Sequence, residues 1–142
     1  NFRMRAMLIS FASYHLWLNW IQTSEYLASL FTDYEPGIHY YQVQMQSGTT
    51  GINSIRAYNP IKQSIDQDPN GFFIKRWIPE LKDVPTEFIH EPWNFEKKTN
   101  YPSPIVNEKE SRKKAVKLLY DIKKSITNKE EYNNLVKKQY KI

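Results

Sequence analysis

The first part of the chain is strongly apolar. Residues 3–21 (RMRAMLISFASYHLWLNWI) contain few polar side chains, and this pattern predicts one long helix. The run is short for a membrane span and includes His15 and Asn19, so we expect a buried helix and no membrane contact. A shorter helix is predicted over residues 24–32, where leucine and phenylalanine recur at helical spacing.

The segment from Asp33 to Asn59 has a different pattern. Its first part reads DYEPGIHYYQVQMQSGTTGIN, with two acids, a Pro-Gly pair, paired tyrosines, amides and a turn of small residues. It is too polar for a core strand and lacks sustained periodicity. We therefore predict turns at residues 36–37 and 48–51.

Short apolar pieces separated by turns follow. DPNG at residues 68–71 predicts a turn that leads into FFIKRWIPEL, a short helix limited by Pro79. After a proline-rich connection, helical spacing returns at Ala115, Leu118, Leu119, Ile122 and Ile126. No run alternates as a strand would, so the predicted fold class is all-α.

The length of 142 residues suits one domain or half of a larger one. The chain opens with Asn, already inside an apolar helical pattern, so we expect it to be an excised fragment. We divide it into a domain over residues 1–125 and a basic tail over residues 126–142.

Cysteine is absent from the chain. This excludes disulfides, thiolate zinc sites and cysteine-ligated iron–sulfur clusters, and no metal site is predicted. An absence of cysteine suits a cytoplasmic protein, which is the location that we expect.

The basic charge is concentrated at the C-terminal end. Residues 1–104 carry nine basic and ten acidic side chains, whereas residues 105–142 carry eleven basic and five acidic ones. The overall charge of +5 is therefore weak evidence for nucleic-acid binding, because a solvated helix surface explains such a run equally well.

One ion pair is predicted from the residues alone. Asp33 and Glu35 follow the second helix, and Arg5 lies on the first apolar helix. An arginine within an apolar helix needs a carboxylate partner, so we predict a pair between Arg5 and Asp33. Such a pair would serve a ligand site or only the packing of helices, and these residues do not decide between the two.

Several short motifs in the same order resemble one known family. They are RMRAMLISF, Trp20, DYE, the Gly/Thr turn, NPIKQ, DPNGFFIKRWIPEL, FIHEPW and YPSPIV before a basic helix. Together they are similar to the C-terminal part of the FAD-binding domain of the DNA photolyase/cryptochrome family. The resemblance extends to about residue 125.

This resemblance implies an all-helical domain that holds FAD. In photolyases, excited reduced flavin donates an electron to a pyrimidine dimer flipped out of UV-damaged DNA, and the electron returns after the dimer splits. The cofactor supplies the redox chemistry, and the protein positions it. The antenna chromophore and the lesion type stay open.

The resemblance also assigns residues to the cofactor. Arg5 would pair with Asp33, the first acid of the family's D-x-D motif, and Glu35 takes the place of the second acid. Tyr34 lies between them, so the DYE segment would line the pyrimidine end of the flavin ring. His39 falls where the family places the residue nearest flavin N5, and a hydrogen bond from it would change which flavin form is stable.

Electron transfer and DNA contacts are assigned in the same way. Trp20 matches the middle member of the family's tryptophan chain, although a core tryptophan is the alternative. Val43 and Met45 replace the family's W-x-W, and a valine cannot be oxidised in a hopping step. Arg3 and Arg56 match positions that contact substrate and DNA phosphate, and Met45, with Phe2, would offer an apolar wall to a flipped lesion.

The remaining flavin contacts of the family would lie upstream of residue 1. We therefore expect this chain to hold about half of a flavin pocket and to need the upstream part of its own protein as a partner. Alone, it is expected to bind FAD weakly, to be inactive, and to self-associate through exposed apolar surface.

Three functions are carried forward. The leading hypothesis is a fragment of a deoxyribodipyrimidine photolyase that repairs pyrimidine dimers by light-driven electron transfer from reduced FAD. The first alternative is a cryptochrome-like blue-light photoreceptor without repair activity. The second is a non-catalytic helical module that binds nucleic acid or an acidic partner.

Overall fold

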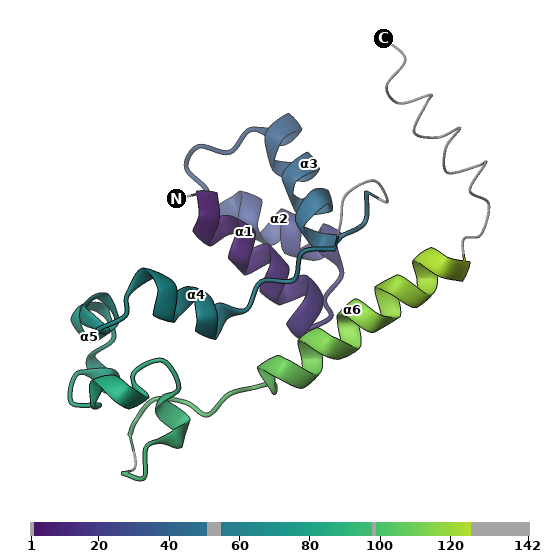
Figure 1. Ribbon diagram of the computed structural model, residues 1–142. Coiled ribbons are helices and arrows are strands. Elements are labelled where there is room, and N and C mark those ends of the chain that lie inside the picture. Colours follow the sequence, from purple (N-terminus) through teal and green to yellow (C-terminus); the bar gives the residue numbers. More distant parts are fainter. Residues whose placement is uncertain (1, 51–54, 98, 126–142) are drawn as a thin grey trace. The chain divides into compact units, whose positions relative to one another are not determined.

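The computed structural model describes residues 2–50, 55–97 and 99–125 (Figure 1). Within these ranges the chain forms helices and turns and no β-strand, so the predicted all-α class is confirmed. None of the described helices combines the length and apolarity needed to cross a membrane.

The chain forms two compact units. Unit 1 combines residues 1–57 with residues 109–142, and unit 2 comprises residues 58–108. The predicted basic tail over residues 126–142 lies outside the described residues, so the boundary at residue 125 stays a prediction.

The first helix is shorter than predicted. Helix α1 spans Phe2–Ser10 and continues into a π-helical turn, η1, over Phe11–His15. The Leu16 N–H donates to the Phe11 carbonyl at 3.1 Å, which is the wide spacing of a π turn. Trp17 then adopts a left-handed backbone with φ 54°, which ends the helical run. The prediction of one helix over residues 3–21 is therefore wrong beyond residue 15.

Helix α2 spans Trp20–Leu30 and begins at a side-chain cap. The Asn19 carboxamide oxygen accepts a hydrogen bond from the Ile21 N–H at 2.8 Å. This contact satisfies one of the first N–H groups of the helix. The predicted second helix therefore exists, but it starts four residues earlier than the apolar spacing indicated.

Helix α3 spans Pro36–Ser47, so residues 36–37, which were predicted to form a turn, begin a helix instead. Pro36 occupies the first helical turn, a position that tolerates proline because its missing N–H would be unsatisfied there in any case. Glu35 caps this end, and Gly48 closes the other end with φ 76°. The predicted turn at residues 36–37 is wrong because a Pro-Gly pair that begins a helix was interpreted as a break, whereas a turn does start at Gly48.

The core of unit 1 lies among the first three helices. Ile9 of α1, Leu27 of α2 and Val43 of α3 form its buried centre, and Trp20 and Phe31 pack against it. The site described below is built on the same three segments.

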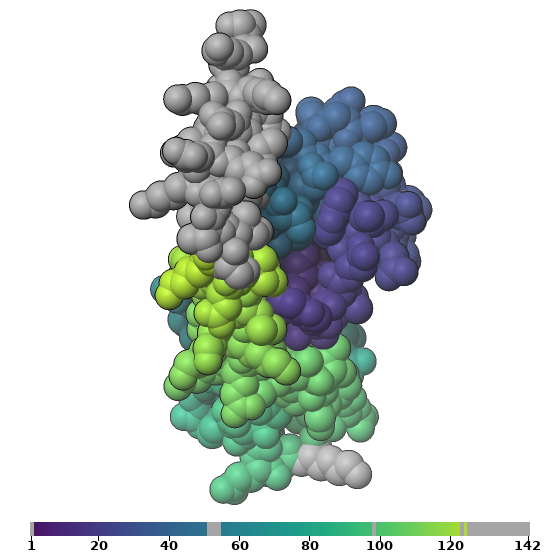
Figure 2. Space-filling model, turned by 90° about the vertical axis from the view of Figure 1, so that its right-hand side faces the viewer, coloured from purple at the N-terminus to yellow at the C-terminus, as the bar shows by residue number. Residues whose placement is uncertain are grey.

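Helix α6, Glu108–Ser125, supplies the last described part of unit 1. Figure 2 shows it against the N-terminal segment, and its Ala115 is buried. Leu118 is 40% exposed and Ile122 is 50% exposed, so the predicted apolar stripe is buried only in part within the described residues.

Unit 2 consists of short helices around its own core. These are α4 Pro60–Gln67, α5 Phe72–Trp77, and the 3₁₀ turns η2 Pro79–Leu81, η3 Thr86–Phe88 and η4 Pro92–Asn94. Leu81, Val84 and Ile89 form the buried centre. The predicted turn at residues 68–71 is present, with the Gly71 N–H donating to the Asp68 carbonyl at 2.8 Å.

We expect Gly48→Ala to destabilise the protein. Gly48 has φ 76°, and a Cβ atom there would lie 2.7 Å from the Tyr14 hydroxyl oxygen. Tyr14 is only 2% exposed, and burial raises its pKa to about 12. Backbone strain and the collision together should lower the free energy of unfolding of the intact protein by about 2 kcal/mol. Chemical denaturation of the flavin-free protein measures this change.

A double variant separates the two causes. In Gly48→Ala combined with Tyr14→Phe, the collision with the hydroxyl is removed while the backbone strain remains. The effect of the alanine should therefore be smaller in the Phe background than in the wild type. An equal effect in both backgrounds would show that the contact with Tyr14 plays no part.

Candidate functional site

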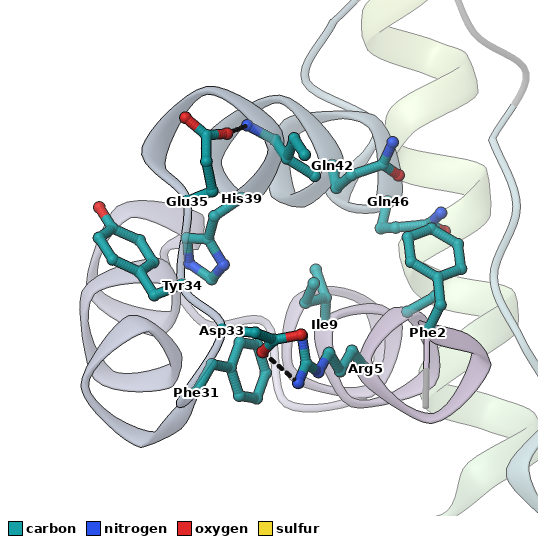
Figure 3. Close-up of a pocket in the computed structure, with 12 residues that line it drawn as sticks. Phe2, Arg5, Ile9, Phe31, Asp33, Tyr34, Glu35, His39, Gln42 and Gln46 are labelled. Atoms are coloured by element: carbon teal, nitrogen blue, oxygen red, sulfur yellow. Dashed lines mark hydrogen bonds and ion pairs between the residues drawn. The ribbon is translucent and has the colours of Figure 1, made fainter.

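A cavity of about 310 Å³ lies in unit 1 between α1, the segment of residues 31–35 and α3 (Figure 3). Its volume is at the small end of the range for ligand pockets, so it suits one ring system rather than a whole dinucleotide. The lining residues are Phe2, Arg5, Ala6, Ile9, Phe31, Asp33, Tyr34, Glu35, Ile38, His39, Gln42 and Gln46. All five residues predicted to contact the cofactor are among them.

Two helix faces form the walls. The α1 residues lie at positions 2, 5, 6 and 9, and the α3 residues lie at positions 38, 39, 42 and 46. Both sets have the spacing of one face of a helix. The sequence interpretation did not assign Gln42 and Gln46 to the site, and helical spacing through the amide run would have found them.

Arg5 and Asp33 form the predicted ion pair. The Arg5 Nη2 atom lies 2.7 Å from Asp33 Oδ1, and its guanidinium lies 4.1 Å from the centre of the Phe31 ring. The hydrogen bond from Arg5 holds the pKa of the Asp33 carboxyl below its usual range. The Arg5 side chain is 34% exposed and that of Asp33 is 67% exposed, so the pair lies at the rim rather than in the interior.

Glu35 is the N-cap of α3. Its Oε2 atom accepts a hydrogen bond from the Ile38 N–H at 2.6 Å. A carboxylate is favourable at a helix N-terminus because it satisfies a free N–H and faces the positive end of the helix dipole. The residue predicted to line the flavin ring therefore also fixes where α3 starts.

His39 is buried, with its orientation set by a backbone carbonyl. Its Nε2 atom lies 2.9 Å from the Ser24 carbonyl oxygen on α2. A carbonyl only accepts, so Nε2 carries the proton, and Nδ1 of the neutral ring is an acceptor. The rings of Phe31, Tyr34 and Tyr40 meet the imidazole edge to face at 5.3–5.7 Å between centres.

Tyr34 borders the pocket beside His39. Partial loss of solvent raises the pKa of its hydroxyl above the ordinary value, and a hydrogen bond with Tyr40 adds to this. Tyr34 is therefore a neutral, amphipathic wall of the pocket at physiological pH.

Gln42 is one of the residues that line the pocket. Its Oε1 atom is inaccessible to solvent and has no hydrogen-bond partner among the residues that the structure describes. An isoalloxazine ring fits this lining, since it offers an aromatic surface for Phe2, Ile9 and Phe31 and polar edges for the charged and amide side chains around them. These residues would hold the ring if FAD binds here.

The other predicted site residues lie outside the pocket. Trp20 packs against the core of unit 1, Arg3 and Arg56 are exposed, and Met45 is half-buried on α3. Their assigned roles in electron transfer and DNA contact stay predictions. Within the part of the chain that the structure describes, no three potential metal ligands gather into a group.

The chain thus has a helical fold with a pocket whose size and lining suit a flat, partly polar ring. Residues 1–121 match the family described as the FAD binding domain of DNA photolyase. The chain therefore belongs to the photolyase/cryptochrome family, as its motifs indicated, and FAD is the cofactor of this family.

Three relatives illustrate the match. The deoxyribodipyrimidine photo-lyase of Buchnera aphidicola subsp. Acyrthosiphon pisum is 37% identical over 122 residues, 82% of this chain and 25% of the relative. Cryptochrome-2 of Arabidopsis thaliana is 36% identical over 117 residues, 74% of this chain and 19% of the relative. The archaeal photolyase of Sulfolobus tokodaii, solved with two FAD molecules, has a TM-score of 0.75 and 36% identity over 85% of this chain and 28% of its own.

The chain thus spans only 19–28% of the length of these relatives. The family and fold are shared along most of this chain, while the relatives include both photolyases and cryptochromes.

We expect Arg5→Gln to raise the pKa of Asp33 toward the ordinary value of about 3.9. A carboxyl whose pKa is lower in the folded than in the unfolded state stabilises the fold at pH values above its unfolded-state pKa. This stabilisation is lost as the pH falls through its folded-state pKa. The stability difference between the wild type and Arg5→Gln should therefore begin to shrink below about pH 4 and disappear once the pH has fallen below the lowered pKa of the folded state. Carbon NMR of labelled aspartate, with Asp33→Asn for assignment, follows the titration.

Lys62→Gln is the matched control. Lys62 pairs with Asp66 at 2.9 Å within α4 of unit 2. The Lys62→Gln substitution therefore removes an ion pair of the same type outside the pocket. It should leave the Asp33 titration unchanged. An Asp33 pKa that does not move in Arg5→Gln would contradict the assigned cause.

Proposed function

We propose that this chain is the part of a deoxyribodipyrimidine photolyase that holds one side of the isoalloxazine ring of FAD. The whole protein repairs UV-induced pyrimidine dimers in DNA. One observation carries the proposal: the five residues assigned to the cofactor by resemblance come from α1, residues 31–35 and α3, and all of them line one pocket. The similarity to photolyases over most of the chain supports the reaction.

The chemistry divides between cofactor and protein. Reduced FAD supplies one electron to the dimer in light and recovers it after the dimer splits, so no net oxidation occurs. The chain would bind and orient the ring through apolar walls at Ile9 and Phe31 and through an acceptor at His39. The Arg5–Asp33 pair closes the rim on one side.

UV-damaged DNA is the proposed partner. The dimer must leave the base stack to approach a buried flavin, so contacts to the flanking phosphates are required. Arg3 and Arg56 are both exposed, and each would provide a phosphate contact that adds affinity without reading sequence. Phe2, which is 60% exposed at the rim, would meet the flipped bases as an apolar wall.

A cryptochrome-like photoreceptor is the second candidate. Met45 stands where the family carries a tryptophan beside the dimer, and it does not line the pocket. Val43, at the position of the family's flavin-proximal tryptophan, has no exposed surface and packs in the core with Trp20. The chain thus lacks the tryptophan that the family places beside a lesion, which favours a signalling role.

The isolated chain should hold FAD weakly. The cavity accommodates only one ring system, and the rim residues Phe2 and Ile38 are 60% and 65% exposed. We infer that the rest of the intact protein completes the cofactor site and covers these apolar side chains. Separated from it, the chain would be inactive and prone to self-association.

Repair by the intact protein tests the leading proposal. The protein with reduced FAD is incubated with an oligonucleotide that carries one thymine dimer, in blue light and in darkness. Restoration of the two thymines only in light is the expected result. If the protein holds reduced flavin and still does not repair this lesion, the proposed activity is rejected and the photoreceptor is favoured.

His39→Leu should lower the midpoint potential of bound FAD. The neutral imidazole keeps Nδ1 as an acceptor because Nε2 donates to the Ser24 carbonyl. An acceptor near flavin N5, the place that the resemblance gives His39, favours the reduced ring because that ring carries an N–H there. Loss of one such bond should lower the two-electron potential by about 30 mV.

Tyr41→Phe serves as the control for this measurement. Tyr41 lies on α3, is 53% exposed and does not line the pocket, so its substitution should leave the potential unchanged. A potential that is equal in His39→Leu and the wild type would contradict an acceptor role for His39.

A further inference from the structure

A group of aromatic rings surrounds His39 at one end of the pocket. The Tyr34 and Tyr40 rings meet the imidazole edge to face, at 5.3 Å and 5.5 Å between centres. Figure 3 shows Tyr34 beside His39, at the end of the pocket away from Phe2. His39 and Tyr34 both line the pocket, whereas Tyr40 is not among the lining residues. A ring bound in the pocket would therefore lie against His39, with the Tyr34 phenol in contact with the same imidazole.

The hydroxyl groups of Tyr34 and Tyr40 are hydrogen-bonded to each other. Partial loss of solvent, together with this bond, raises the pKa of Tyr34, so its phenol is neutral at physiological pH. A neutral phenol can give up one electron and one proton, because loss of the electron makes its hydroxyl group strongly acidic. Tyr34 thus brings an oxidisable group to the edge of the pocket.

The described lining of the pocket contains no tryptophan. Val43 stands at the position of the family's flavin-proximal tryptophan, and Trp20 packs against the core that contains Val43. The side chains that give up one electron most readily are those of tryptophan, tyrosine and cysteine, and the chain has no cysteine. Within the described lining, Tyr34 is therefore the residue that is oxidised most readily.

We propose that Tyr34 donates an electron to the oxidised flavin ring in light, and so converts bound FAD to the reduced form that repair requires. The inference rests on the proposed function, because it requires FAD in this pocket. Oxidised flavin in its excited state is a strong one-electron oxidant, and this property belongs to the cofactor. The chain contributes the electron donor and its place beside the ring.

A soluble thiol as the final reductant balances the electrons and protons of this step. Tyr34 loses one electron to the ring and its O–H bond breaks. The phenol proton passes to water, which reaches this residue because 40% of its surface is exposed. The thiol then returns a hydrogen atom to the phenoxyl radical of Tyr34. Two such rounds, with two protons taken up from water, reduce FAD by two electrons and join two thiols in one disulfide.

The lifetime of flavin fluorescence measures this electron transfer directly. The intact protein is loaded with oxidised FAD, and time-resolved fluorescence is recorded without thiol. Electron transfer from Tyr34 shortens the excited state of the wild type. Tyr34→Phe keeps the aromatic ring and removes the oxidisable phenol, so it should lengthen the lifetime several-fold. Tyr34→Trp supplies another oxidisable ring and should restore a short lifetime.

Three further variants decide whether Tyr34 is the donor. Tyr41→Phe is the matched control, because Tyr41 lies on α3, is 53% exposed and is not among the lining residues. Tyr40→Phe and Trp20→Phe remove the other oxidisable rings considered for this role. All three variants should keep the short lifetime of the wild type. If the lifetime lengthens in Tyr40→Phe or Trp20→Phe but not in Tyr34→Phe, the electron comes from another residue and the proposal is overturned.

Continuous blue light in the presence of a thiol tests whether the transfer leads to reduced FAD. With oxygen excluded, the wild type should lose the absorbance band of oxidised flavin in light. Tyr34→Phe should lose this band several-fold more slowly. Dithionite in darkness should reduce the flavin of both proteins completely, because chemical reduction needs no donor from the protein.

The outcomes separate this inference from the proposed function. Equal lifetimes and equal rates of photoreduction in the wild type and Tyr34→Phe, each with FAD bound, would overturn the role of Tyr34 and leave FAD binding intact. A wild-type protein that binds no FAD would instead reject the proposed function, and this inference with it.

Discussion

The pocket depends on close packing between α1 and α3. Ile9 is 3% exposed and belongs to the buried centre of unit 1. It also lines the cavity, so the same side chain is part of the core and part of the pocket wall. Val43 faces it from α3 with no exposed surface. Because protein interiors are close-packed, the side chains beneath the pocket set the distance between its walls. A smaller residue at either position would change the shape of the site as well as the stability of the fold.

The charged side chains that line the pocket bind partners within the protein. Arg5 and Asp33 neutralise each other at the rim, and an exposed pair of this kind contributes little to stability. Its structural effect is to tie α1 to the segment before α3, 28 residues further along the chain. The remaining carboxylate of the lining, Glu35, accepts from the Ile38 N–H, and the other polar groups are hydroxyl, imidazole and amide groups. Such a mixture of apolar walls and a few directional polar groups is typical of ligand pockets.

Sequence reasoning identified the fold class from apolar spacing and the Arg5–Asp33 pair from charge. The pair was expected because a buried arginine needs a partner, whereas the structure has it at the rim, with Asp33 67% exposed. The same reasoning missed α3 because Pro36 at a helix start has the same appearance as Pro in a break. The π turn before Trp17 carries no residue signature, so the length of the first helix was not predictable from its apolar run. The five cofactor positions came from family resemblance, whereas Gln42 required the helix face and its burial to be known.

The cap at Glu35 affects where the diphosphate of a bound dinucleotide could lie. Helix N-termini commonly bind phosphate, because free N–H groups and the helix dipole attract anions. In α3 that end already carries a carboxylate from the chain itself, which would repel a second negative group. The diphosphate of FAD would therefore lie away from this end of the helix, and only an uncharged portion of the cofactor would approach it.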